Sequence, residues 1–395
     1  MSVFTPFKRS DCAWAFAISM FILPFSVSAR SLDIPSSGSG ISFGNSKAFT
    51  GLRFNYRDRD VDYVNGINVT LWKPYESDQL SRIKGFSLGP LPGGGSLSGI
   101  QLGALGIAAE TQIKGISFAL LGIGSGAVVK GISIAGLGLG TGGIMTGVNI
   151  GGLGVGAGGV LSGITLAGLG AGSGGDATGL TIAGLGVGAG GDLMGVTLAG
   201  LGAGASENAT GLHCAGLGLG VGGKLTGISL AGFGVGAGGD IVGISLAGFG
   251  VGAGKSIKGI TIGGFGVGAG KSIKGITIGG LGVGAGSELC GITLAGLGAG
   301  GRSVKGLAMA GITVAGKELG GVQLALATVR VVDDGRMSLF SASAFNHIQG
   351  TQSGLSIGLV NYARRLKGLQ LGLINIVRDN RKHLRVLPLF NADFH

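Results

Sequence analysis

Two consecutive stretches, GISLAGFGVGAGKSIK (Gly243–Lys258) and GITIGGFGVGAGKSIK (Gly259–Lys274), carry the pattern that decides the fold of this chain. Each opens on a glycine, and a glycine recurs every 16 residues from Gly99 to Gly291, which defines thirteen units. A period of this length, kept over so many units, is typical of solenoids and other repeat arrays. Glycine makes up 91 of the 395 residues, far above the usual share of about 7%. Positions within the unit are counted below from the opening glycine, which is position 1.

The apolar residues of the unit follow the periodicity of β-strands. They occupy positions 2 and 4, then 7 and 9, and then 15, and a spacing of two within a group is typical of a strand. The parity changes between the groups, so the chain must turn corners there, at residues that favour turns. A helix is excluded because each unit holds about six glycines, each of which costs a helix about 1 kcal/mol relative to alanine.

These features predict an all-β fold, an elongated β-solenoid of 16-residue coils with irregular N- and C-terminal caps. We expect positions 2, 4, 7, 9 and 15 to face inward. Thirteen coils at ~4.8 Å each would form a rod ~60 Å long. A transmembrane β-barrel is the alternative, since segments such as 100–109 have the length that a strand needs to cross a bilayer and the chain ends near Phe394. Barrel strands alternate apolar and polar residues throughout, however, whereas the parity of this unit breaks.

The N-terminus has the composition of a secretory signal peptide, predicted over residues 1–29. Lys8 and Arg9 precede an apolar stretch, Ala13–Val27, and small residues lead to a cleavage site near Ala29. An exported protein is therefore expected.

Three further regions follow the signal peptide: an N-terminal β cap (residues 30–98), the glycine-rich solenoid (99–306), and irregular repeats with a C-terminal cap (307–395). Caps are expected because the open edge of a coil can template aggregation. Within the last region, the turn-forming pair Asp334-Gly335 predicts a β-hairpin.

The glycine-lysine-serine runs of the quoted stretches resemble phosphate-binding loops but miss the required pattern. The motif G-x-x-x-x-G-K-[ST] needs its first glycine where Phe249 and Phe265 stand, and the residues that follow form a strand instead of a helix. No helix N-terminus is then available to hold a phosphate, so nucleotide binding is excluded. Nucleic-acid binding is not expected either, because clustered arginines with aromatic residues are missing from the repeats.

Two sets of residues are candidates for contacts with a partner. Positions 8 and 10 are almost invariably glycine, and because position 9 is expected to face inward, these glycines should form a smooth outward face where another surface packs. The alternative is that a narrow coil needs glycine there for a positive φ. Lysines at positions 13 and 16 of adjacent coils should form a basic ladder able to contact an anionic surface. The packing-face candidates are Gly234, Gly236, Gly250, Gly252, Gly266 and Gly268, and the ladder candidates are Lys255, Lys258, Lys271 and Lys274.

Other polar and sulfur-containing residues give no pattern that points to catalysis. Position 3 is usually Ser or Thr and is interpreted as strand surface, and His213, which replaces it in one unit, is expected to be exposed. Cys214 at position 4 is expected to be a buried thiol, nearly five coils away from Cys290 and too far for a disulfide. The histidines have no metal-ligand spacing. We therefore expect no enzyme activity and no cofactor.

The C-terminal stretch resembles the end of bacterial surface repeat-containing proteins, which carry G-[LV]-Q-[IL]-G-L-[IVL]-N units. Residues 354–361 (GLSIGLVN) and 368–375 (GLQLGLIN) match this unit, and the chain closes on a similar L-P-L-x-N segment. The 16-residue repeats are similar to a related form of the unit, with glycine where asparagine often stands. The resemblance implies an exported surface protein without catalytic residues.

Together these features predict a non-enzymatic, exported cell-surface repeat protein that acts as a structural scaffold or interaction surface, located at the cell surface or outer membrane. The alternative is an integral outer-membrane β-barrel protein. The partners expected are a second copy of the chain or the surface of the outer membrane and cell envelope.

Overall fold

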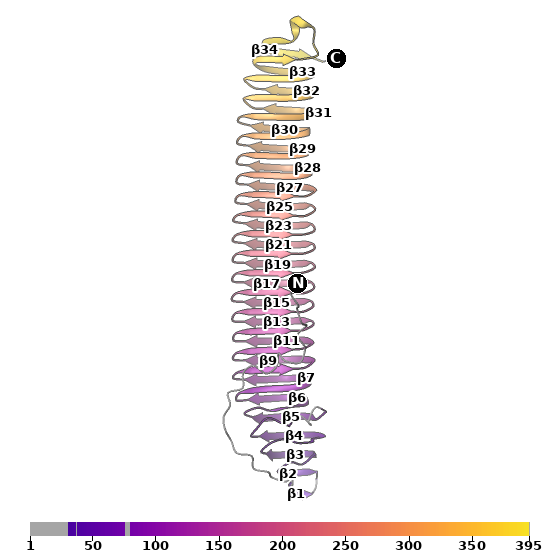
Figure 1. The fold of residues 1–395 in the computed structure, drawn as a ribbon, viewed down its shortest axis with the longest axis vertical. Helices are drawn as coiled ribbons and strands as arrows, with labels where there is room; N and C mark the ends of the chain where they lie inside the picture. Colours follow the sequence, from indigo (N-terminus) through magenta and orange to yellow (C-terminus); the bar gives the residue numbers. More distant parts are fainter. Residues whose placement is uncertain (1–30, 37, 76–79, 395) are drawn as a thin grey trace, which may run out of the picture.

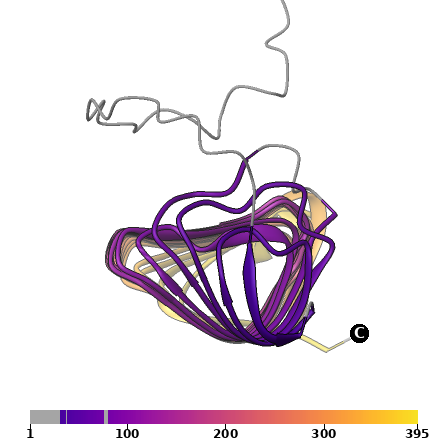
Figure 2. The same cartoon turned by 90° about the horizontal axis from the view of Figure 1, so that it is seen from below.

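The computed structural model describes residues 31–36, 38–75 and 80–394, and shows a straight rod of stacked β-coils (Figure 1). The predicted signal peptide lies outside the described residues. Seen along the rod, most coils superpose on a rounded triangular outline, and the indigo coils at the N-terminal end depart from it (Figure 2). The predicted all-β solenoid of 16-residue coils is confirmed.

The strands follow one another along the chain in three groups. The first is β1 (Leu32–Ser36), β2 (Ser39–Phe43), β3 (Ala48–Asn55), β4 (Tyr63–Thr70), β5 (Arg82–Gly89), β6 (Gly93–Gly103) and β7 (Gly106–Ala119). The second is β8 (Gly122–Ser125), β9 (Val128–Ala135), β10 (Gly138–Thr141), β11 (Ile144–Gly151), β12 (Gly154–Ala157), β13 (Leu161–Ala167), β14 (Gly170–Ser173), β15 (Ala177–Ala183), β16 (Gly186–Ala189), β17 (Leu193–Ala199), β18 (Gly202–Ala205), β19 (Ala209–Ala215), β20 (Gly218–Val221), β21 (Leu225–Ala231), β22 (Gly234–Ala237), β23 (Ile241–Ala247), β24 (Gly250–Ala253), β25 (Ile257–Gly263), β26 (Gly266–Ala269) and β27 (Ser272–Gly279). The third is β28 (Gly282–Ala295), β29 (Gly298–Ala310), β30 (Thr313–Ala325), β31 (Thr328–Ala342), β32 (Phe345–Ile357), β33 (Val360–Val377), the 3₁₀ turn η2 (Lys382–Leu384) and β34 (Val386–Asp393).

Each regular coil contains one long and one short strand, and each strand pairs in parallel with its equivalent one coil further on. In the long strands β23 and β25, Ile244 lies opposite Ile260. In the short strands β24 and β26, Val251 lies opposite Val267. The 16-residue period of the sequence is therefore the register of the sheet.

The structure corrects the prediction of which positions face inward. Positions 9 and 15 are buried as expected, but positions 2, 4 and 7 point outward, and the interior is completed by positions 3, 5 and 11. In β23, Ser245 at position 3 is 1% exposed, whereas Ile244 at position 2 is 37% exposed. Position 3 was interpreted as surface, and it is core. The outward side chains of the long strands are thus larger and more apolar than the inward ones at positions 3 and 5. The narrow interior holds small residues there, with one large aliphatic side chain at position 15 in most coils.

The glycine at position 1 turns a corner that no other residue type fits well. Gly243 has a φ of +123°, in the region that favours glycine. A Cβ atom there would also collide with the carbonyl oxygen of Gly227 in the preceding coil. This column of positive-φ residues continues from Gly40 to Gly368, with Leu339 (φ 87°) in register as its one member that is not glycine.

The stack extends beyond the boundaries predicted at residues 99 and 306. Strands β2 to β6 and β29 to β33 pair in parallel like the regular coils. The two ends are closed by strands of opposite direction, because β1 pairs antiparallel with β2 and β34 pairs antiparallel with β33. Antiparallel end strands cover edges that would otherwise be free to pair with other chains.

Two predictions of strand arrangement are wrong. The expected hairpin at Asp334-Gly335 is absent, since β31 runs through both residues and pairs in parallel with β30 and β32, with extra residues taken up as a register shift. The alternative of a closed barrel is also wrong, because β1 and β34 lie at opposite ends of the rod (Figure 1). No helix among the described residues has the length and apolar character needed to span a membrane.

The glycines at positions 1 and 10 of one coil should respond differently to replacement by alanine, in the stability of the folded chain. Replacing Gly243 should lower stability by about 2 kcal/mol or more, because a left-handed residue with a Cβ costs about 1–2 kcal/mol before the collision with Gly227 is counted. Replacing Gly252 should leave stability unchanged or raise it by up to about 1 kcal/mol, since its φ is not positive and its Cβ would meet nothing within 4 Å. Thermal unfolding of Gly243→Ala and Gly252→Ala tests this contrast. Equal destabilisation would show that position 10 is constrained within the coil.

Candidate interaction surfaces

The six glycines predicted to form a packing face lie side by side on the short strands β22, β24 and β26. They face outward, because the valine between each pair is buried. A Cβ added at Gly236, Gly252 or Gly268 would have open space around it, and one at Gly234 or Gly250 would make at most a tight contact. None of the six has a positive φ, so the alternative explanation from backbone conformation is wrong. Their partner, if any, remains a prediction.

The residues of the motif that resembled a phosphate-binding loop are spread over separate surfaces. Phe249 and Phe265 point outward at position 7 instead of filling the core, and they form a stack with Phe233 in which ring centroids are 4.8 and 4.7 Å apart. Lys255 and Lys271 lie at a different corner of the coil. No helix N-terminus is formed by these described residues. The arrangement therefore has an aromatic ridge and a basic corner in place of a nucleotide site.

The lysine ladder is formed by exposed side chains on adjacent coils. Lys258 lies opposite Lys274 in β25 and β27. The positive charge of the ladder is partly neutralised at its C-terminal end. There the Glu288 carboxylate accepts hydrogen bonds from Lys274 at 3.0 Å and from Lys305 at 3.1 Å. Hydrogen bonds from these two lysines lower the pKa of Glu288. Contact of this ladder with an anionic surface remains a prediction.

A buried polar column runs through the interior of the rod and was missed by the sequence analysis. It contains the inward residues at position 3 and their equivalents in the end coils, in one continuous register from Ser42 in β2 to Gln370 in β33, with Ala308 the one apolar member. In the sequence this column is visible as a regular Ser or Thr between two aliphatic residues. That pattern shows that successive side chains point to opposite faces of the strand, but not which face is the inner one.

His213 is a member of this polar column, between Thr197 and Ser229. It was expected to be exposed, and it is fully buried. Neither ring nitrogen has a hydrogen-bond partner among the described residues. Burial lowers the pKa of His213 below its usual value of 6.5, since the charged form of a buried histidine is poorly solvated.

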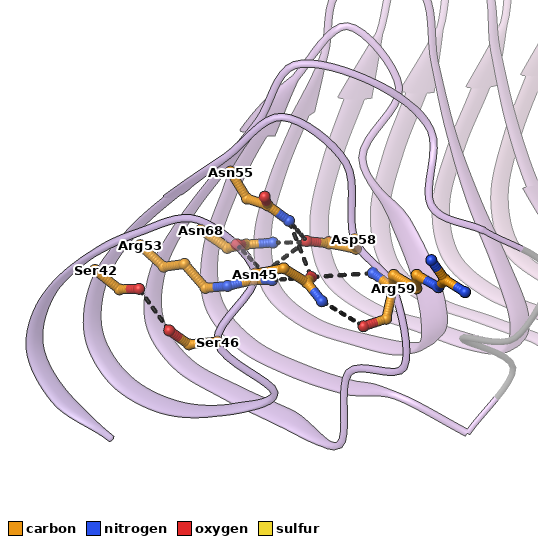
Figure 3. Close-up of polar contacts among 8 residues, drawn as sticks. All are labelled: Ser42, Asn45, Ser46, Arg53, Asn55, Asp58, Arg59 and Asn68. Atoms are coloured by element: carbon orange, nitrogen blue, oxygen red, sulfur yellow. Dashed lines mark hydrogen bonds and ion pairs between the residues drawn. The ribbon is translucent and has the colours of Figure 1, made fainter. Parts of the chain in front are cut away.

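The N-terminal end of the polar column holds a buried ion pair (Figure 3). The Arg53 guanidinium donates to Asp58 at 2.6 Å and to Asn68 at 2.9 Å, through the same nitrogen Nη1. Its other terminal nitrogen donates to Asn45 at 2.9 Å, and Asn55 donates to Asp58 at 2.9 Å. Both charged side chains are nearly inaccessible to solvent. Removing any one of these side chains would leave a buried charge or amide without its partner, which is strongly destabilising. The network therefore holds the first coils in one arrangement.

The C-terminal coils contain a buried asparagine ladder. Asn346 donates to Asn361 at 2.7 Å, and Asn361 donates to Asn375 at 2.8 Å. Through the register, this ladder continues the inward column that holds Val283 and Val314 in earlier coils. The asparagine of the C-terminal unit thus corresponds to the inward aliphatic residue of the 16-residue repeat. The family resemblance had suggested that it corresponds to an outward glycine, and this is wrong.

An apolar groove follows one corner of the rod. Two hollows, of about 670 and about 1270 Å³, are lined by positions 4, 5 and 6 of successive coils, the first from Ile182 to Gly248 and the second from Ile278 to Leu373, with Leu389 of β34 at its end. Cys214 borders the groove at position 4 and is half-buried, so the prediction that it is a core thiol is wrong. Cys214 and Cys290 are both free thiols.

The described residues contain no group of three or more His, Cys, Asp or Glu side chains arranged to hold a metal ion. Comparisons with protein-family models, with curated proteins and with solved structures find no match to this chain. The surfaces described above are therefore the basis for any function proposed.

The ion pair of the N-terminal coils predicts a strong local effect of one conservative substitution. Asp58→Asn should destabilise β3 and β4 by about 3–5 kcal/mol, because it leaves the buried Arg53 guanidinium without its counter-charge. Amide hydrogen exchange in these strands measures the effect. Asp60→Asn is the matched control, since Asp60 is exposed and its ion pairs with Lys47 and Arg59 are 3.8 and 3.9 Å long; it should change stability by less than about 1 kcal/mol. Similar protection in both variants would contradict a structural role for the buried pair.

The burial of His213 predicts a pH dependence of stability. Because its folded-state pKa is below 6.5, the unfolded chain takes up a proton first as the pH falls, and stability should decline below about pH 6.5. His213→Thr, which restores the residue type of neighbouring coils, should flatten this dependence between pH 7 and pH 5, as measured by thermal unfolding. His383→Gln, at an exposed position, should retain the wild-type slope. A slope unchanged in His213→Thr would assign the acid sensitivity to other groups.

Proposed function

We propose that this chain is a non-enzymatic, exported cell-surface repeat protein that serves as an elongated scaffold or interaction surface. The observation that carries the proposal is the continuous parallel stack from β2 to β33, which repeats outward apolar side chains at positions 2, 4 and 7 in every coil of its regular part. Such a rod offers a long binding surface with many equivalent sites, as other repeat arrays do.

Three features support a role at a surface. The N-terminal residues have the composition of a signal peptide, the lysine ladder is exposed at one corner, and the C-terminal units resemble those of bacterial surface repeat-containing proteins. The stack also ends at both termini in an antiparallel strand, so the parallel pairing of coils does not continue directly from one rod to another. The candidate partners are a second copy and the surface of the cell envelope.

Labelling of intact cells tests the proposed location. In bacteria that express the full chain, a membrane-impermeant amine reagent should label the exposed lysines of the rod, such as Lys255 and Lys271. A chain lacking residues 1–29 should remain inside the cell and escape labelling. The proposal fails if the full chain is labelled only after the cells are broken, or if removal of residues 1–29 does not change its location.

A further inference from the structure

The long strands of the coil are more apolar on their outer side than on their inner side. In β23 and β25 the inward residues at position 3 are Ser245 and Thr261, whereas the outward residues at position 2 are Ile244 and Ile260. Parallel sheets are normally covered on both faces, and their strands then read as continuous apolar runs. These strands instead alternate small inward residues with large aliphatic outward ones, so it is their outward side that has the apolar character of a covered face.

The outward side chains at positions 2 and 4, from Ile100 to Met309, form what we call the aliphatic face. Position 2 is Ile, Val or Leu in every coil, and position 4 is Ile, Leu, Phe, Met or Cys, so no charged residue interrupts it. With about fourteen coils at ~4.8 Å and about four residues at ~3.3 Å, the face measures roughly 65 by 13 Å, or about 850 Å². An exposed apolar patch of that size marks an interaction site in soluble proteins.

The shape of this face is complementary to itself. The position-4 side chains form a ridge, and beside its part from Ile182 to Met309 lie the two hollows, which are floored there by the small residues of positions 5 and 6. A surface that joins two copies around a twofold axis must contact the same surface of its partner. A ridge next to a groove meets this condition, because each copy can place its ridge in the groove of the other.

We propose that a second copy of this chain covers the aliphatic face, in a side-by-side dimer of two rods. The area of about 850 Å² on each copy agrees with the roughly 800 Å² per partner of a stable interface. Side chains on both rods repeat with the same coil spacing, so contacts made by one coil are repeated along the interface. A fluid bilayer has no such periodicity, which favours a second copy over lipid. The proposal concerns the purified protein and stands independently of its cellular location.

Two methionines of equal exposure provide an internal test. Met309 lies on the aliphatic face and lines the groove, and Met194 lies at position 16, outside the face; each is 40% exposed in the single chain. In protein purified without detergent, light scattering should give twice the mass of one chain. Mild peroxide should then oxidise Met309 several-fold more slowly than Met194, and dilution that lowers the mass to one chain should bring the two rates together.

A charge-substituted variant tests the same interface. Ile228→Lys, Ile244→Lys and Ile260→Lys combined should convert the dimer to a monomer with unchanged circular dichroism. The control combines Thr210→Lys, Thr226→Lys and Val242→Lys, which adds the same three charges to neighbouring coils at position 16, and it should remain a dimer. If the first variant does not fold, the methionine rates in the wild-type protein decide the question.

Several results would overturn the proposal. They are a single-chain mass at all concentrations, an assembly larger than a dimer, equal oxidation of Met309 and Met194 in the dimer, and a folded Ile→Lys variant that stays dimeric. Monomeric protein that co-sediments with vesicles of phosphatidylglycerol and phosphatidylcholine, with protection of Met309, would show instead that a membrane covers the face.

Discussion

The fold depends on the close stacking of each coil on the one before it. The corner glycines, such as Gly243 above Gly227, adopt a positive φ and lie so near the neighbouring carbonyl that a Cβ would not fit. This contact sets the register of the long strands, and with it the direction of every side chain that follows. A single coil holds too few large buried side chains to offset the conformational entropy of ordering its residues, so its stability comes mainly from neighbouring coils.

Stacking in register lets polar groups inside the end coils pair with one another, whereas in the middle coils the buried polar atoms of Asn149, Ser229 and Thr261 have no hydrogen-bond partner among the described residues. Side chains at the same position lie above one another, so an amide or a hydroxyl can pair with its equivalent one coil away, as Asn346 does with Asn361 and Ser341 with Ser356. The end coils use this most, with amides at one end and the Arg53–Asp58 pair at the other. The coils at the two ends of the rod are thus held by directional hydrogen bonds between buried side chains. The middle coils are held mainly by the packing of the apolar residues at positions 9 and 15.

The outer surface of the rod divides into regions of different chemistry. The aliphatic face, the ridge at position 7 and the glycine ribbon at positions 8 and 10 are apolar, and the charged residues of the regular coils are at positions 12 to 16. A rod with this distribution suits association along its length rather than recognition of a small molecule. At position 10 neither the conformation nor the packing of a single chain requires glycine, because a Cβ at Gly236, Gly252 or Gly268 would meet nothing within 4 Å.

The sequence by itself determined the period, the strand character and the solenoid, because these follow from the spacing of the apolar residues and from the cost of glycine in a helix. The direction of the side chains was decided only by the tertiary structure. Hydrophobicity predicted that Ile244 and Phe249 would be inside and His213 outside, and each prediction was wrong. The physical reason is the size of the interior: a coil this narrow accepts Ser, Thr, Ala and Val on most of its inner side. The larger apolar residues must then lie outside, where a partner rather than the coil's own core can bury them.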